Sequence, residues 1–244
     1  MATSYEIQGR TVTIPVEVRR ARQWGAQFLV DAEAAQEVVA PTGLTVARPF
    51  PGKAMLSLAV VQYLDTDLDA YHEVAIAFVV RPHDAPGADS DWQRAREFFT
   101  GQVGAYIHQL PVTETFTLEA GRSIWGFPKF LADIDIRDVG RRTLCELRQD
   151  GELILALDMR RGGPIRLPAP EAPSYSYADG VLRRTEFTAA GDDRGAVLGG
   201  TEIELGDHPI AKELAGLGLP KRAFMTMHVG DLRATFQDPE VVTV

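Results

Sequence analysis

The sequence predicts a mainly β (α+β) fold, a closed or nearly closed antiparallel β-barrel with a few short helices. Most segments either alternate apolar and polar residues or form short apolar runs rich in β-branched side chains, as strands do. Turn-forming residues such as Asp150-Gly151 separate neighbouring segments at hairpin spacing. Only a few stretches have helical periodicity. Folds of this kind can hold a small ligand in their interior.

In the first half of the chain, the pattern predicts strands separated by two helices. The strands are expected at 11–18, 27–30, 55–64 and 71–80, and the helices at 32–39 and 92–102. Asp31 is the expected cap of the first helix, because its side chain can accept the free amide hydrogens of the first turn. The second helix follows a loop at 82–91 and has an apolar face formed by Trp92, Ala95, Phe98 and Phe99.

In the second half, strands dominate again. We expect them at 113–118, 131–137, 143–148, 152–159, 185–188, 199–205 and 222–236, with one short helix at 209–215. A turn at Glu119-Ala120-Gly121 should follow the first of these strands, and the proline-rich segment 162–176 should lack regular structure. No compositional break or repeat divides the chain, so residues 1–244 are predicted to form a single domain.

The composition excludes several classes of protein. A net charge of −9 argues against a nucleic-acid partner, because phosphate binding requires a basic face. No apolar stretch approaches the roughly 20 residues of a membrane helix, and the N-terminus has no signal-peptide pattern. The single cysteine, Cys145, cannot form an internal disulfide, and the five histidines show no ligand spacing. We therefore expect a cytoplasmic protein that binds neither a metal nor a membrane.

Lysine is rare in this chain, and one lysine has an unusual setting. Only four of the 25 basic residues are lysine, which indicates a need for an amine, because arginine is never deprotonated. Lys129 lies near Trp125, Phe127 and Phe130 in the sequence. Burial among such side chains would lower the pKa of the lysine and make its amine nucleophilic. The alternative is a lysine at a turn, with its amine in water.

The residues around Lys129 resemble a known signature. Gly121-Arg122 followed by Gly126-Phe127-Pro128-Lys129 is similar to the Gly-Arg and Tyr-Pro-Lys segments of acetoacetate decarboxylases, with the lysine seven residues after the arginine. The segment Tyr71-His72-Glu73 resembles the family's Tyr-x-Glu, whose glutamate lies in the active site. The resemblance implies a closed or cone-shaped barrel of that family, a homo-oligomer, a Schiff-base role for Lys129, and an acid–base or orienting role for Glu73.

Two departures from the family pattern concern the substrate. The family has a second lysine directly after the first, where this chain has Phe130. The family's carboxylate-binding arginine falls near Ala21, which lies between Arg20 and Arg22. These two arginines would share one face of a regular strand. One of them is expected to hold the carboxylate of the substrate, and the sequence leaves open which.

The leading hypothesis is a cofactor-independent Schiff-base lyase that acts on a small β-keto or 2-oxo acid, as a decarboxylase does. Besides the two arginines, the expected substrate-binding residues are Tyr71, Trp125, Phe127, Phe130 and Arg122. For Arg122, a structural role is also open, in which it orients the loop before Lys129.

Two other functions remain open. The first is an aldolase-dehydratase or hydratase that uses the same lysine on pyruvate-like substrates. Phe130 favours it, and so does the absence of a further family carboxylate, because Gln62 and Tyr63 occupy that region. The second is a non-catalytic barrel that binds a small apolar molecule, in which Lys129 would be unreactive.

Overall fold

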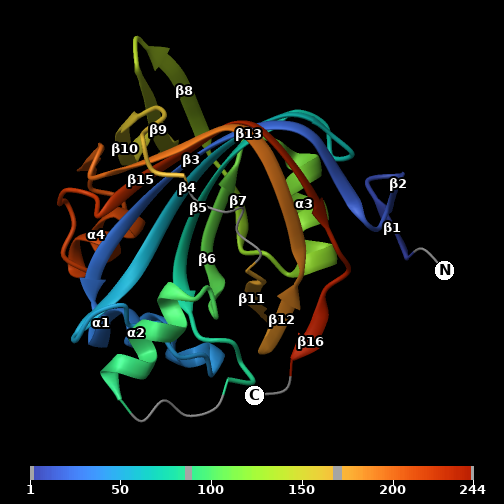
Figure 1. Ribbon diagram of the computed structural model, residues 1–244. Helices are drawn as coiled ribbons and strands as arrows, with labels where there is room; N and C mark the ends of the chain where they lie inside the picture. The colour runs from blue at the N-terminus through green and yellow to red at the C-terminus, as the bar shows by residue number, and fades with distance from the viewer. Residues whose placement is uncertain (1–2, 86–89, 167–171, 243–244) are drawn as a thin grey trace.

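The fold is mainly β throughout residues 3–85, 90–166 and 172–242, which a computed structural model describes (Figure 1). The strands are β1 (Ser4–Ile7), β2 (Arg10–Thr13), β3 (Val16–Asp31), β4 (Lys53–Thr66), β5 (Tyr71–Val80), β6 (Gly104–Val112), β7 (Lys129–Leu131), β8 (Asp133–Val139), β9 (Arg142–Gln149), β10 (Glu152–Arg160), β11 (Ser174–Ala178), β12 (Val181–Thr185), β13 (Phe187–Leu198), β14 (Thr201–Leu205), β15 (Met225–Phe236) and β16 (Glu240–Val242). The helices are α1 (Ala32–Val39), α2 (Asp91–Phe99), α3 (Thr115–Trp125) and α4 (Pro209–Gly216), with a short 3-10 helix, η1 (Ala40–Thr42). None of these helices is long and apolar enough to cross a membrane.

One large sheet organises the molecule. In the described residues it contains ten strands in the order β13-β15-β3-β4-β5-β6-β11-β12-β16, with β7 beside β6. All its pairings are antiparallel except those of β6 with β7 and with β11. Among the described strands the order stays open between β13 and β16, so the structure does not confirm the closed barrel. On the inner side lies α3, whose Trp125 meets Phe236 of β15 with ring centroids 6.2 Å apart.

The large sheet has apolar side chains on both faces. A second sheet, in the order β14-β10-β9-β8, shares a buried cluster with one face, in which Trp24, Leu58 and Ile76 lie with Leu147 and Leu155. The opposite face borders a cavity. This arrangement explains why β4 and β5 are apolar along almost their whole length, since neither face of these strands meets bulk water.

Several predicted elements are confirmed. Helix α1 begins after Asp31, whose carboxylate accepts the amide hydrogens of Glu33 and Ala34, both at 3.0 Å. Strands β4 and β5 lie where the two apolar runs predict them. The hairpins β8–β9 and β9–β10 also form, the second around the Asp150-Gly151 turn. Helix α4 matches the short helix expected at 209–215.

The strand predicted at 113–118 and the turn predicted at 119–121 are wrong, because residues 115–125 form helix α3. The buried residues Phe116, Ala120 and Ile124 recur every four positions, so burial of one helical face outweighs the strand preference of the threonines. The helix also lacks a side-chain cap at Glu114, so the usual signal of a helix start is missing.

Helix α2 forms where the sequence predicts it, but the expected apolar face is not the buried one. Trp92 is 79% exposed and Phe99 is 62% exposed. The buried residue of this helix is Glu97, which forms an ion pair with Arg81 at 2.8 Å. A paired carboxylate therefore ties α2 to the residue that follows β5, on a helical face other than the one expected to be buried.

Some boundaries also differ from the prediction. The strand expected at 11–18 is interrupted at Pro15, which has no amide hydrogen for a strand ladder, so β2 and β3 lie on either side of it. Strand β13 extends well beyond the predicted 185–188, because it pairs with β15 along almost its whole length. Parts of the loops predicted at 82–91 and 162–176, namely residues 86–89 and 167–171, lie outside the described residues.

Cys145 lies in the core between the two sheets, and we expect its thiol to be unreactive in the folded protein. It is 1% exposed, and burial raises the pKa of the thiol to about 12. Since the thiolate is the reactive form, DTNB should release no chromophore from native protein at about pH 8 and should react fully after denaturation in guanidinium chloride. Absorbance measured over time checks this, and rapid reaction of native protein would contradict the burial.

Candidate active site

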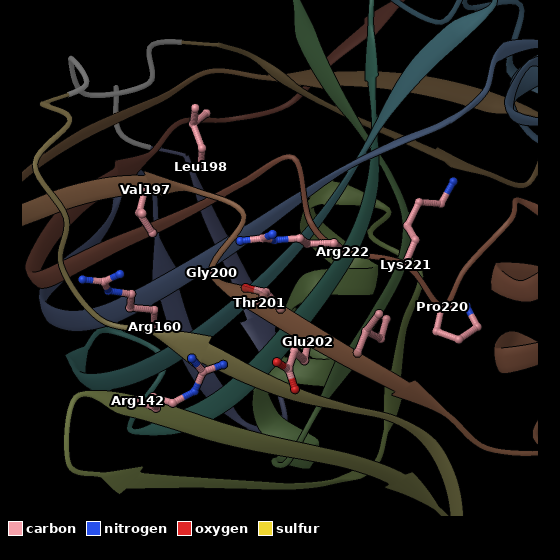
Figure 2. Close-up of a pocket in the computed structure, with 11 residues that line it drawn as sticks. Arg142, Arg160, Val197, Leu198, Gly200, Thr201, Glu202, Pro220, Lys221 and Arg222 are labelled. Atoms are coloured by element: carbon pink, nitrogen blue, oxygen red, sulfur yellow. The ribbon is translucent and has the colours of Figure 1, made fainter.

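At least two hollows in the described structure can hold a small molecule. The first, of about 640 Å³, lies between β10, the β13–β14 turn and the segment 220–222. Figure 2 shows that many of its side chains are charged, including Arg142, Arg160, Glu202, Lys221 and Arg222. The second, of about 320 Å³, is the cavity on the inner face of the large sheet. Its wall is mainly apolar and contains an amine paired with a carboxylate, so it is the candidate active site.

The cavity lies against β3, β4, β5, β6, β13 and β15, which curve around it. Its apolar walls include Val16, Val61, Leu110, Phe187, Leu232 and Phe236. Its polar side chains are fewer: Gln23, Gln27, Ser57, Tyr63, Thr66, Tyr71, Glu73, Lys129 and Ser174. Charges at such a wall interact more strongly than they do in water, because the surroundings are weakly polarisable.

Lys129 and Glu73 form a buried ion pair in this wall. The Lys129 Nζ lies 2.9 Å from Glu73 Oε2 and donates a hydrogen bond to Thr117 Oγ1 at 3.0 Å. Lys129 is 3% exposed and Glu73 is 7% exposed. Two opposite charges that are removed from water require each other, since either one alone would be left buried without a partner.

Two tyrosines complete the surroundings of the pair. The Tyr63 hydroxyl donates a hydrogen bond to Glu73 Oε1 at 3.1 Å, and the Tyr71 ring centroid lies 5.0 Å from Lys129 Nζ. The two tyrosine rings stack with centroids 4.4 Å apart. Burial, followed by the charge of Glu73, holds the pKa of both phenols well above their usual range. Both hydroxyls therefore stay protonated near neutral pH and can donate hydrogen bonds.

The end of α3 fixes the position of Lys129. Gly126 has a φ of +65° and ends the helix in the left-handed region, which favours glycine. After Pro128, the chain enters β7 at Lys129, which pairs in parallel with Leu110 of β6. Arg122 Nε donates a hydrogen bond to the Lys129 carbonyl at 2.7 Å. Arg122 therefore orients the backbone of this segment and is absent from the described lining of the cavity.

The face of α3 that meets Lys129 is shaped to receive it. Thr117 and Gly121 are four residues apart, so they lie one above the other on the same helical face. A Cβ built at Gly121 would lie 2.5 Å from both Cδ and Cε of Lys129. Because Gly121 has no side chain, the Lys129 side chain can pass over it and reach the Thr117 hydroxyl.

Of the aromatic residues predicted to surround Lys129, some line the cavity and one does not. Tyr71, Trp125 and Phe127 all contribute to its wall. Phe130 follows Lys129 on β7, so it points to the opposite side, where it packs against the cluster between the two sheets. The position that carries a second lysine in the family is therefore turned away from the cavity.

Arg20 and Arg22 lie outside the cavity, contrary to the expectation that one of them holds a carboxylate there. The pairing of β3 with β4 has register shifts within residues 18–21, so the strand alternation is broken at this point. Arg20 is exposed. Arg22 forms an ion pair with Asp138 at 2.6 Å and lies over the Trp24 ring, on the face toward the second sheet.

Sequence reasoning missed several polar groups around the cavity, among them Thr117 of α3 and two glutamines of β3. Thr117 falls in the segment predicted as a strand, and its spacing of four from Gly121 is the helical signal that would have identified it. Gln23 and Gln27 line the cavity from β3. They point inward because of the irregularity at 18–21, which the apolar pattern of the sequence does not reveal.

Comparisons with solved structures agree on the fold. The chain is similar to an acetoacetate decarboxylase from Legionella pneumophila, with a TM-score of 0.72 and 17% identity over 94% of this chain and 87% of that one. A second acetoacetate decarboxylase structure gives a TM-score of 0.69 and 19% identity over 93% of this chain and 89% of that one. A third structure is that of the enduracididine biosynthesis enzyme MppR, complexed with the condensation product of pyruvate and imidazole 4-carboxaldehyde. It gives a TM-score of 0.69 and 14% identity over 93% of this chain and 88% of that one. No curated protein sequence matches the chain.

The match to a family model covers nearly all of the sequence. The model described as acetoacetate decarboxylase (ADC) matches residues 4–242, from the first residue of β1 to the last residue of β16. In the same described part of the chain, no group of three or more His, Cys, Asp or Glu side chains is placed to hold a metal ion. The chain belongs to the acetoacetate decarboxylase family.

Proposed function

We propose that this protein is a cofactor-independent Schiff-base lyase that acts on a small β-keto or 2-oxo acid, with Lys129 as the imine-forming amine. The observation that supports it most is a lysine amine 2.9 Å from a carboxylate and 3.0 Å from a hydroxyl, at the wall of an apolar cavity. Apolar residues can often replace a buried ion pair without loss of stability, so an ion pair at the wall of a cavity favours a chemical role. Membership of the acetoacetate decarboxylase family supports the same role.

The reaction begins with a proton transfer. Glu73 takes a proton from the Lys129 ammonium, and the neutral amine attacks the carbonyl carbon of the substrate. The resulting carbinolamine takes this proton back on its hydroxyl group and loses water, which leaves a protonated imine beside the Glu73 carboxylate. In a β-keto acid, the carboxylate then departs as carbon dioxide, and the bonding electron pair enters the imine to give an enamine. Protonation of the enamine carbon and hydrolysis release the ketone and restore Lys129.

The surrounding groups favour the charged intermediate. The Glu73 carboxylate attracts the protonated imine, and the Tyr71 ring presents its face to the same cation. The Tyr63 hydroxyl holds the second oxygen of Glu73, which keeps Oε2 directed at Lys129. These groups are already in place before substrate binds, so little reorganisation accompanies imine formation.

A second candidate function keeps the imine and changes the later steps. In an aldolase-dehydratase or hydratase, the enamine of a pyruvate-like acid would attack or release a second carbonyl compound. The identity of Phe130 favours this reading, because no second lysine follows Lys129 in the chain. The similarity to MppR, whose structure holds a condensation product of pyruvate, points the same way.

Borohydride trapping tests the imine. With acetoacetate or pyruvate and sodium borohydride, intact and peptide mass spectrometry should show a reduced adduct on the Lys129 peptide. Which of the two acids forms the adduct distinguishes the two candidate functions. Lys129→Ala and Lys129→Arg should lose the adduct and reduce turnover by on the order of 10³-fold or more. Lys53→Arg, at an exposed lysine, is the matched control. Full turnover in Lys129→Arg would refute the imine mechanism.

Glu73→Gln tests the acid–base role. The amide cannot accept the ammonium proton, so the rate of adduct formation should fall by about 10²–10⁴-fold, while Lys129 remains present. The measurement is the initial rate of borohydride-trapped adduct, with circular dichroism as a check on folding. An unchanged rate would assign proton transfer to another group.

Gly121→Ala tests how Lys129 is positioned. Alanine favours a helix by about 1 kcal/mol over glycine, so α3 should not be weakened by propensity. The new methyl group, however, would occupy the path of Lys129 Cδ and Cε and displace the amine. We expect adduct formation to slow by on the order of 10²-fold.

The control for this substitution is Gly216→Ala in α4, where a Cβ would meet nothing within 4 Å. It should leave the adduct rate unchanged. Equal rates in Gly121→Ala and the unmodified protein would show that the lysine reaches its position by another path.

A further inference from the structure

The cavity continues beyond the amine, along three strands. Residues of β3, β4 and β5 lie side by side in rows across this part of the sheet. The row at the ion pair is Gln23, Val61 and Glu73; the next is Gly25, Ala59 and Ala75; the third is Gln27, Ser57 and Ala77. The first and third rows are four residues apart, a separation of about 13 Å at roughly 3.3 Å per residue.

The middle row leaves space for a ligand. Ala59 and Ala75 line the cavity with single methyl groups. Gly25 has no side chain and lies on β3, between Ala59 of β4 and Met227 of β15. Met227 covers Gly25, since its terminal carbon would lie 3.3 Å from a Cβ built there. Ala59 and Ala75 therefore form the floor of a channel that leads away from Glu73, with Met227 beside them.

The far end of the channel carries no charge. Gln27 Nε2 donates a hydrogen bond to Ser57 Oγ at 2.9 Å, so these two polar groups already have each other as partners. On the other side, Val79, Ala105 and Ile107 continue the apolar wall. A ligand that reaches this region therefore gains most by burying apolar surface.

The distribution of positive charge restricts the ligand further. All 25 lysines and arginines lie in the described ranges 3–85, 90–166 and 172–242, and of these only Lys129 lines the cavity. Once Lys129 is an imine, its single positive charge faces the Glu73 carboxylate. One substrate carboxylate next to the imine can share that charge, whereas a second one farther along the channel would be buried without a partner.

From this shape and charge, we propose that the substrate is a β-keto monoacid with an apolar chain on its carbonyl carbon. The alkyl chain of the substrate lies over the floor formed by Ala59 and Ala75, and its carboxylate stays near the amine. Loss of carbon dioxide then yields a methyl ketone with the same chain. This inference rests on the proposed imine chemistry of Lys129 and adds the substrate class.

Methyl ketones of increasing length test it, because they are the stable products that form the same imine. Borohydride trapping is carried out with acetone, 2-pentanone, 2-heptanone and 2-nonanone, and the concentration for half-maximal adduct at Lys129 is measured by intact mass. This concentration should fall by up to about fourfold per added methylene, as expected for burial of an alkyl chain. No dependence on length, or weaker binding of longer ketones, would overturn the apolar-chain proposal.

A matched pair of ketones tests the charge. 6-Oxoheptanoate equals 2-heptanone in chain length but ends in a carboxylate. We expect at least about tenfold weaker trapping of the acid, because no cation awaits it in the channel. Equal trapping of the two would overturn the restriction to monoacids. Absence of an adduct at Lys129 with every ketone, by contrast, would overturn the proposed imine function itself.

Substitutions in the channel test where the alkyl chain of the ligand lies. Ala59→Leu and Ala75→Leu, at two positions of the same row, should each flatten the dependence on ketone length, because leucine fills the channel. Ala190→Leu is the matched control, since this exposed residue follows Ala189 of the cavity wall on β13 and faces outward. If the concentration for half-maximal adduct still depends fully on ketone length in both channel variants, with the fold intact by circular dichroism, the alkyl chain lies elsewhere and the proposal is overturned.

Discussion

The buried ion pair between Lys129 and Glu73 is the interaction on which the site depends. Removing one partner of a buried pair typically costs about 3–5 kcal/mol, so each residue constrains the other. Glu73 comes from β5 and Lys129 from the start of β7, with β6 between these strands. The strand order around β6 is therefore a requirement of the site as well as of the sheet.

Helix α3 connects the fold to the chemistry in two ways. Its C-terminal end, at Gly126 and Pro128, directs the chain into β7 so that Lys129 faces the cavity. Its inner face then receives the same lysine side chain, through the space at Gly121 and the hydroxyl of Thr117. A glycine within a helix costs up to about 1 kcal/mol relative to alanine, and here that cost gives the amine its place.

Much of this arrangement could be predicted from local sequence. The apolar runs of β4 and β5, the cap at Asp31 and the Asp150-Gly151 hairpin follow from short-range rules, and the segments around Lys129 and Glu73 resemble the family signature. The helix α3 could not be predicted from propensity, because burial of one face decides it. The irregularity at 18–21 in β3 is a property of pairing with β4, so sequence alternation could not show which way Arg20 and Arg22 point.

That irregularity determines the character of the cavity. It directs Arg22 to Asp138 on the second sheet and turns Gln23 and Gln27 inward, so no guanidinium group reaches the described cavity wall. In the proposed reaction, the protonated imine is then the positive charge available to a substrate carboxylate. Decarboxylation converts this cation and anion into a neutral enamine and carbon dioxide. Because an apolar cavity solvates charges poorly, it favours the step in which both charges disappear, and the apolar wall itself thus contributes to the proposed reaction.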